Sequence, residues 1–536
     1  MPAGRRWSCV TCRLRSPWTD NGGPRILAHI ASEALNGLQG HLVEVEADVV
    51  AAAPAFTIVG LPDAAVQESR ERVRAAIVNS SYEFPSRRIT VNLAPADLRK
   101  EGPSFDLPIA LAFLLATGQA VDGSGDRGPL AAVGELGLDG SVRPVTGALA
   151  LAEDLWRRGV RGLLLPAANA AEAALVRGLE VYPVNSLAEA VRQLGTGGEA
   201  SAPPADVAAL LCCAPPGGAD FADICGQDQV KRALEVAVAG AHNVLMSGPP
   251  GAGKTMLARR LPTIMPALTL DEAIEITRIH SVAGLLPAGV PLVMRRPLRS
   301  PHHTISSPGL IGGGGTPRPG EVSLAHLGVL FLDEFPEFRL SALEGLRQPL
   351  EDGEVTISRR LTSVTFPARI MLVAAMNPCP CGYRGDRERE CSCPAHRVRQ
   401  YSARLSGPLL DRVDLRLEVP RVPPRDRQGG GRGEASGAIR ERVRLARERQ
   451  IRRLAGTGAY TNAHMDVRHL RRLCTLKPEA SALLDRAYDR LRLSARACDR
   501  VVKVAQTIAD LEGAAGIGAA HIAESLSYRS RSSRAG

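Results

Sequence analysis

The sequence contains no long hydrophobic run, and this absence excludes one class of protein. Although 45% of its 536 residues are hydrophobic, no apolar stretch reaches the roughly 18 residues that a membrane-spanning helix needs. The first 23 residues are irregular and lack the apolar segment of a secretory signal peptide, and no short-period repeat is present. We therefore expect a cytoplasmic globular protein, long enough for about two to four domains with large cores.

Positive charge is concentrated near the carboxyl terminus. The whole chain carries a formal net charge of +10, whereas residues 421–536 contain 24 Lys and Arg against 12 Asp and Glu. A basic domain of this kind favours polyanions, and nucleic acid above all. The alternative is a solvated arginine-rich face without a partner.

A glycine-rich loop is the most informative motif. The apolar stretch Val244–Met246 predicts a strand, and a helix is expected to begin near Met256. Between them lie eight residues with the pattern of a phosphate-binding loop: Gly248, Pro249, Pro250, Gly251, Ala252, Gly253, Lys254 and Thr255. Backbone N–H groups turn toward phosphate oxygens, Lys254 reaches the β- and γ-phosphates, and Thr255 binds Mg²⁺. The pattern predicts ATP and Mg²⁺ as cofactors; a glycine turn with a surface lysine is the alternative.

A second motif supplies the acids that such a site needs. Val329–Leu332 is a continuous apolar run, which suits a parallel strand covered on both faces. Asp333 at its carboxyl end is expected to hold Mg²⁺, directly or through water, and Glu334 to orient and polarise the attacking water. A helix amino terminus enriched in acids is the alternative.

Three further polar residues are candidates for the hydrolytic site. Asn377 follows the apolar strand 370–375 and is expected to sense the γ-phosphate; the alternative is an asparagine in a turn before a proline. Arg412 follows an apolar pair and is a candidate arginine finger for a neighbouring subunit's ATP. Arg496 is a candidate for reaching the nucleotide from a helical lid. Either arginine could instead be an ordinary salt-bridge partner.

Four cysteines lie within 15 residues, as Cys379, Cys381, Cys391 and Cys393. Four thiolates so close in sequence can form a tetrahedral Zn²⁺ site, although Cys-x-x-Cys is a commoner spacing than Cys-x-Cys. Zinc would hold together a polar loop that otherwise has little hydrophobic core. Reduced free thiols are the main alternative.

Changes in composition predict the domain boundaries. We expect an irregular tail at residues 1–23, a mixed α/β domain at 24–195 and a linker at 196–219. These are followed by an α/β domain with the phosphate-binding loop at 220–420, a second linker at 421–437 and a helical domain at 438–530. The helical domain is predicted to open with an amphipathic helix capped by Ser436. The inner side of this helix is predicted from residues that recur at helical spacing, which are Ile439, Val443, Ala446, Gln450 and Leu454.

The order of these motifs resembles that of AAA+ ATPases, and four phrases narrow the resemblance to the magnesium-chelatase-like YifB/ComM family. The phrases are Val59-Gly60-Leu61-Pro62-Asp63, Ser300-Pro301-His302-His303-Thr304, Pro319-Gly320-Glu321-Val322-Ser323-Leu324-Ala325-His326 and Asn377-Pro378-Cys379-Pro380-Cys381-Gly382. The resemblance covers roughly residues 25–530. It implies a ring-forming, hexameric ATPase with helicase-like branch-migration activity on DNA recombination intermediates, notably in natural transformation.

The same resemblance implies a β-hairpin before the strand that carries Asn377. Residues 352–361 alternate as a strand does and include Arg359 and Arg360. In a ring such a hairpin would point into the pore, where the two arginines would track DNA phosphates. An ordinary edge hairpin is the alternative.

The amino-terminal domain resembles the Lon protease domain, an α/β fold of the ribosomal-protein-S5 type. The resemblance rests on the segments 99–104 and 134–140, and it places Ser104 where that family has its nucleophile. The lysine that would activate such a serine is replaced by Leu149, which cannot accept a proton. We therefore expect a Lon-like fold without peptidase activity.

These observations together predict an ATP-driven DNA motor of α/β fold with a helical lid. Three other classes remain open: an ATP-gated DNA-binding scaffold, a metal-chelatase motor subunit and an ATP-dependent protease. Leu149 argues against the protease.

Overall fold

The structure is a computed structural model whose described residues fall into two compact units. It describes residues 27–123, 129–196, 218–287, 289–315, 317–358, 363–386, 388–422 and 433–529. One unit comprises Met1–Leu35 and Gln39–Ala205, and the other comprises Asn36–Leu38 and Asp206–Gly536. No helix in the described ranges is long and apolar enough to cross a bilayer. Most of the two predicted linkers, and the whole of the predicted tail, lie outside the described residues.

The amino-terminal unit is built on a mixed sheet of seven described strands. Their order is β3-β4-β2-β1-β5-β8-β9, and their bounds are Ala55–Val59, Arg88–Ala94, Gln39–Val50, Leu27–Asn36, Leu130–Ala132, Gly162–Pro166 and Glu180–Val184. In β2 every second side chain, from Val43 to Val49, is buried, as expected for a strand with one face on the core. The short strands β6 and β7 form a separate pair at Glu135–Leu136 and Val142–Arg143.

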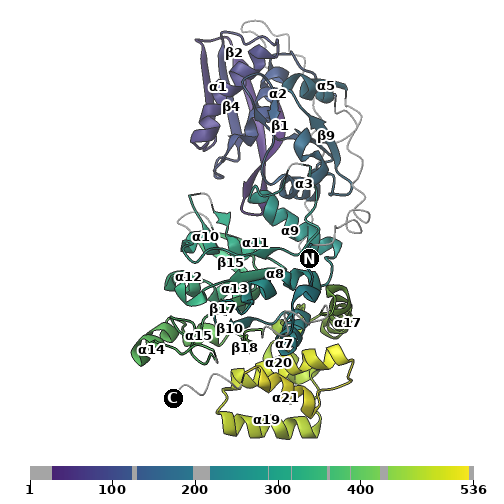
Figure 1. The fold of residues 1–536 in the computed structure, drawn as a ribbon. Helices are drawn as coiled ribbons and strands as arrows, with labels where there is room; N and C mark the ends of the chain where they lie inside the picture. Colours follow the sequence, from purple (N-terminus) through teal and green to yellow (C-terminus); the bar gives the residue numbers. More distant parts are fainter. Residues whose placement is uncertain are drawn as a thin grey trace. The chain divides into compact units, whose positions relative to one another are not determined.

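Five α-helices accompany this sheet in the described residues, and Figure 1 labels α1, α2, α3 and α5. Their bounds are α1 Ala64–Asn79, α2 Asp106–Ala116, α3 Ala148–Arg157, α4 Ala170–Ala173 and α5 Leu187–Thr196. Helix α2 is buried on nearly all sides and supplies much of the core, which explains why its sequence is apolar almost throughout.

The carboxyl-terminal unit is built on a parallel sheet of five described strands. Their order is β11-β14-β17-β10-β18, and their bounds are Leu298–Arg299, Val329–Leu332, Met371–Met376, Val244–Ser247 and Leu415–Glu418. All four residues of β14 are buried, as its continuous apolar sequence predicts for a strand covered on both faces. The structure thus confirms the α/β class and the parallel sheet.

The strand order positions the functional loops. Strand β10 pairs in parallel with β17 on one side and β18 on the other, and β17 pairs in parallel with β14. The carboxyl ends of β10, β14 and β17 therefore lie at the same edge of the sheet. The segments that follow these three strands carry the glycine loop, Asp333 and Asn377.

The helices and short strands around this sheet complete the α/β part of the unit (Figure 1). They are α7 Asp228–Gly240, α8 Lys254–Ile264, α9 Leu270–Val282, α10 Ser307–Ile311, β12 Gly312–Gly313, β13 Arg318–Pro319, α11 Glu321–Leu324, α12 Leu340–Gly345, α13 Arg347–Asp352, α14 Ala395–Ala403 and α15 Gly407–Leu410. The predicted hairpin is present as β15 Glu354–Ser358 paired with β16 Ser363–Pro367. Arg359 and Arg360 lie outside the described residues.

Helices at the carboxyl terminus form a bundle. They are α17 Ser436–Leu454, α18 Val467–Leu473, α19 Pro478–Leu491, α20 Ala495–Glu512 and α21 Ala519–Ser527. The five positions predicted for the inner side of α17 are all buried. Ser436 is not the cap that the sequence suggested: it is the first residue of the helix, and its hydroxyl accepts a hydrogen bond from the Phe221 backbone N–H at 2.8 Å.

Candidate active site

The glycine loop leaves open space where phosphates would lie. Gly251 and Gly253 have φ of 78° and 88°, a backbone region that strongly favours glycine. No heavy atom lies within 4 Å of where a Cβ would stand on either residue. At Gly248 the reason for glycine is different, because a Cβ there would lie 2.2 Å from the carbonyl oxygen of Val419. The loop is therefore packed at its base and open at its turn, as a phosphate cradle requires.

Lys254 is the first residue of α8 and is 8% exposed. Its Nζ donates to the carbonyl oxygens of Gly248 at 2.6 Å and Pro249 at 3.1 Å, and to Asn377 Oδ1 at 3.1 Å. Burial lowers the pKa of this ammonium. All three partners are neutral, so an incoming phosphate would offer Lys254 a negative charge that these contacts do not supply.

Thr255 and Asp333 meet at the same edge of the sheet. The Thr255 hydroxyl donates to Asp333 Oδ2 at 2.8 Å, although 78 residues separate them in sequence. Asp333 directly follows β14, and Thr255 belongs to the first turn of α8. A hydroxyl and a carboxylate are oxygen ligands of the kind that Mg²⁺ prefers, so the residues present fit this ion.

Glu334 adopts a left-handed backbone conformation, with φ of 53°. A non-glycine residue in this region is strained, and such strain is concentrated at functional sites. Its Oε2 lies 3.0 Å from Nδ1 of His303, whose ring is 4.1 Å from that of His302. Sequence reasoning assigned no role to His303, although the adjacent histidine pair was a visible signal.

Asn377 directly follows β17, the strand between the phosphate-loop strand and the Asp333 strand. Its side chain meets Lys254, as described above, so the structure brings Lys254, Thr255, Asp333 and Asn377 to one edge of the sheet. Their arrangement can hold a phosphate chain, a divalent cation and the end of the nucleotide.

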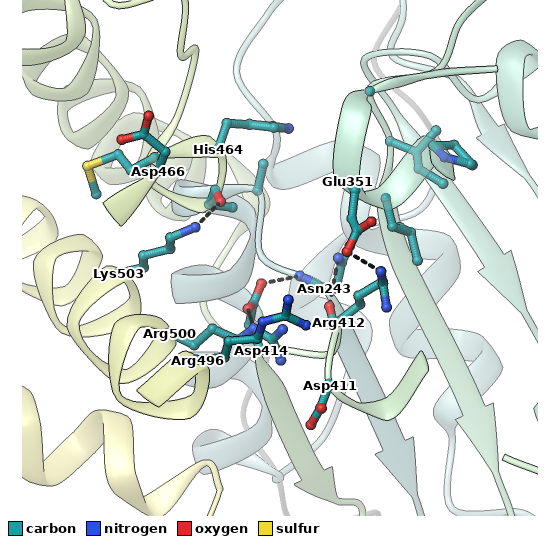
Figure 2. A pocket seen from close by; sticks show the side chains of 17 residues that line it. Asn243, Glu351, Asp411, Arg412, Asp414, His464, Asp466, Arg496, Arg500 and Lys503 are labelled. Carbon is teal, nitrogen blue, oxygen red and sulfur yellow. Dashed lines mark hydrogen bonds and ion pairs between the residues drawn. The ribbon is translucent and has the colours of Figure 1, made fainter. Parts of the chain in front are cut away.

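Arg412 and Arg496 lie elsewhere in the unit. Both line a cavity of about 380 Å³ together with Arg500 and Lys503 (Figure 2). Arg412 forms an ion pair with Glu351 and donates to the Pro408 carbonyl at 2.6 Å.

The cavity belongs to the opposite edge of the sheet from the glycine loop. Asn243 immediately precedes β10, and its Nδ2 donates to the Arg412 carbonyl at 3.0 Å. The backbone N–H of Asn243 donates to Oδ2 of Asp414, the residue that directly precedes β18, at 3.1 Å (Figure 2). Arg412 thus stands at the amino end of the parallel strands, whereas Lys254 follows their carboxyl end.

The four clustered cysteines also converge. Cys379, Cys381, Cys391 and Cys393 place their Sγ atoms within 4.8 Å of one another. Cys379 is fully buried, and the other three are half-buried.

In the amino-terminal unit, Ser104 lies in the short 3₁₀ turn Pro103–Phe105 and Leu149 in α3. Leu149 is 1% exposed and packs as a core side chain. Lys100, four residues before Ser104, is fully buried, and its Nζ donates to the Pro95 carbonyl.

Models of the magnesium chelatase family match three stretches of the chain. "Magnesium chelatase, subunit ChlI" matches residues 220–427, "Subunit ChlI of Mg-chelatase" matches residues 45–169, and "Magnesium chelatase, subunit ChlI C-terminal" matches residues 433–529.

Two full-length relatives and one partial relative illustrate the similarity. The chain is 44% identical to competence protein ComM of Haemophilus influenzae and 43% identical to the uncharacterized protein YifB of Salmonella typhimurium. Each comparison covers 94% of this chain and 97% of the relative. Lon protease 2 of Bacillus subtilis is 34% identical over 149 residues, which is 25% of this chain and 26% of that protein.

Proposed function

Because this chain belongs to the magnesium-chelatase-like YifB/ComM family of AAA+ ATPases, we propose that it is an ATP-driven, ring-forming motor that acts on DNA. The observation that carries the ATPase part is the meeting of Lys254, Thr255, Asp333 and Asn377 at one edge of the parallel sheet.

Each residue of the site has a proposed role. The glycine loop and Lys254 bind the phosphates, and Thr255 and Asp333 hold Mg²⁺. The ion, when bound, draws negative charge from the phosphates. Asn377 contacts the γ-phosphate in the position where its side chain now meets Lys254.

Glu334 is proposed to orient the attacking water and accept its proton. Only one of its two carboxylate oxygens, Oε2, lies 3.0 Å from His303 Nδ1, so His303 can orient the carboxylate while Oε1 accepts the proton.

Arg412 is proposed to complete the site of an adjacent subunit. The finger must come from a neighbour because Arg412 and Lys254 of one chain stand at opposite ends of the parallel strands. A head-to-tail ring, here a hexamer, brings such opposite faces together. Arg496, on the same cavity, is proposed to act on that neighbouring nucleotide as well.

DNA is the proposed substrate, and branch migration of recombination intermediates is the proposed activity. Support comes from the competence protein among its relatives and from the basic carboxyl-terminal segment. Arg359 and Arg360 are the proposed DNA contacts in the pore.

The amino-terminal unit is proposed to be a Lon-like platform without peptidase activity. Leu149 occupies the position of the activating lysine, and Lys100 donates to a backbone carbonyl. Leucine cannot accept a proton, so Leu149 cannot activate Ser104.

The test is ATP-dependent separation of a labelled four-way DNA junction by the purified protein, with Lys254→Ala as control. We expect the wild-type protein to separate the junction and the variant to leave it intact. If the wild type hydrolyses ATP but leaves the junction intact, the branch-migration proposal fails, and an ATP-gated DNA scaffold becomes the better description.

A further inference from the structure

We propose that Cys379, Cys381, Cys391 and Cys393 form a structural Zn²⁺ site that holds the sensor residue Asn377 and the phosphate-binding loop in their working positions. The second half of this inference rests on the proposed ATPase function. The first half, that the site binds zinc, is independent of it.

The distances between the sulfur atoms match a tetrahedral zinc site. Cys379 Sγ lies 3.4 Å from Cys381 Sγ and 3.6 Å from Cys391 Sγ, and the last two are 3.6 Å apart. Four thiolates at the Zn–S distance of about 2.3 Å stand about 3.8 Å apart at the corners of a tetrahedron. The observed spacing is therefore close to that of a ZnS₄ centre.

Backbone amides support the sulfur atoms. The N–H of Cys381 donates to Cys393 Sγ at 3.3 Å, and the N–H of Cys393 donates to Cys391 Sγ at 3.5 Å. Such outer hydrogen bonds orient thiolate ligands and stabilise their negative charge.

The loop that carries the cysteines has almost no apolar core. Between the end of β17 and the start of α14, Cys379 and Gly382 are the buried residues in the described part of the loop. Tyr383 and Asp386 are instead held from outside by Arg421, whose Nε lies 3.2 Å from Asp386 Oδ2. A metal would supply the cohesion that burial does not, as in other small structural zinc sites.

The same loop touches the nucleotide site at two points. Cys379 is two residues from Asn377, whose side chain meets Lys254. Gly382, at φ of 85°, packs so closely on the glycine loop that a Cβ would lie 2.6 Å from Pro250 Cδ. A shift of the cysteine loop would therefore move Asn377 and remove a support of the phosphate-binding loop.

The first arm of the test measures metal content and needs neither hydrolysis nor DNA. Full-length protein grown with zinc is dialysed, and its zinc is measured by mass spectrometry. We expect one zinc per chain in the wild type and in Cys498→Ser, and none in the double variant Cys381→Ser/Cys391→Ser. Cys391→His keeps a zinc ligand and should retain the metal. Zinc that is far below one per chain in the wild type, or that the double variant retains, would overturn the site.

The second arm measures coupling to the nucleotide site. Zinc is removed from the wild type with a strong chelator and then restored, and both binding of a fluorescent ATP analogue and kcat are followed. Because misplacement of a catalytic group by about 1 Å can cost about 10²-fold in rate, we expect kcat to fall by about that factor and to recover with zinc. Trypsin should cut at Arg384 and Arg389 faster without zinc.

The outcomes separate the proposals. Unchanged nucleotide binding, kcat and cleavage after complete zinc removal would refute the coupling while leaving the metal site intact. A zinc-loaded wild type that hydrolyses ATP but leaves the DNA junction intact would refute only the DNA proposal.

Discussion

Mixing two inactive variants should restore ATP hydrolysis if Arg412 serves a neighbouring subunit. Lys254→Ala removes the lysine that is proposed to bind phosphate, and Arg412→Ala removes the proposed arginine finger. In one chain these residues cannot meet. The carbonyl oxygen of Arg412 accepts a hydrogen bond from Asn243, which directly precedes β10. The glycine loop begins at Gly248, five residues after Asn243. At about 3.3 Å per residue the strand separates the two positions by about 16 Å, beyond the reach of one arginine side chain.

The expected size of the effect follows from ring geometry. Arg412→Ala alone should lose about 10³-fold or more of the wild-type rate, the range that arginine fingers contribute. Lys254→Ala alone should also be inactive, because it lacks the lysine that is proposed to bind the phosphates. In an equal mixture of randomly assembled rings, about a quarter of the interfaces combine an intact glycine loop with an intact arginine. The mixture should therefore recover about a quarter of the wild-type rate per subunit.

The assay is phosphate release after the variants are dissociated, mixed at several ratios and reassembled, with size-exclusion chromatography to check the oligomer. Phosphate release should be fastest when the two variants are mixed in equal amounts. Arg486→Ala is a matched control, since this arginine of α19 is exposed and donates a hydrogen bond to the Ala482 carbonyl of its own helix. A mixture no faster than the mean of its two components would refute the assignment of Arg412 to a neighbour's site.

Three further perturbations test individual side chains. Glu334→Gln should keep ATP binding and lower kcat by about 10²–10⁴-fold, because the amide cannot accept the proton of water. Equilibrium binding measures the ATP affinity of the variant, and single-turnover hydrolysis measures its rate of chemistry. Normal turnover would show that Glu334 is not the residue that activates water. His303→Ala should lower kcat by about tenfold with little change in KM, because the Glu334 carboxylate loses the imidazole that lies 3.0 Å from its Oε2; a change confined to KM would contradict this positioning role. Burial and the negative charge of Asp154 raise the pKa of Glu33 from 4.5 to about 9, although the positive charge of Arg158 opposes the shift. The folded state therefore keeps a proton that the unfolded state loses, and the free energy of unfolding of the amino-terminal unit should fall as pH rises through that window, by up to about 1.4 kcal/mol per pH unit. Urea melts at about pH 5 and about pH 8 should show this loss in the wild type and a smaller one in Glu33→Gln, and equal slopes would refute it.

Local features were predictable because their physical causes are local. The glycine loop depends on backbone conformations at successive residues, and Gly251 and Gly253 do have positive φ. Strand β14 was predictable because four adjacent apolar residues suit a strand covered on both faces, although it ends at Leu332, before the two acids. The inner side of α17 followed from its 3.6-residue period.

The prediction for Ser436 shows where local reasoning stops. Serine before an amphipathic run favours a cap, yet its hydroxyl bonds to the Phe221 N–H, 215 residues earlier in the chain. Packing against a distant segment decided its role. The His303–Glu334 contact was missed for the same reason, since nothing near Glu334 in sequence indicates which loop will face it.

The sequence alone determined the chemical groups that this protein carries: a glycine loop with a lysine and a threonine, a pair of acids after a buried strand, an asparagine after another strand and four clustered cysteines. Tertiary structure decided which of these groups meet. Strand β17 lies between β10 and β14 although it follows both in the chain, and this order brings Asn377 to Lys254 and Thr255 to Asp333. The parallel pairing of β18 with β10 sends Arg412 to the opposite edge. Strand order depends on packing between segments far apart in sequence, so no local pattern encodes it.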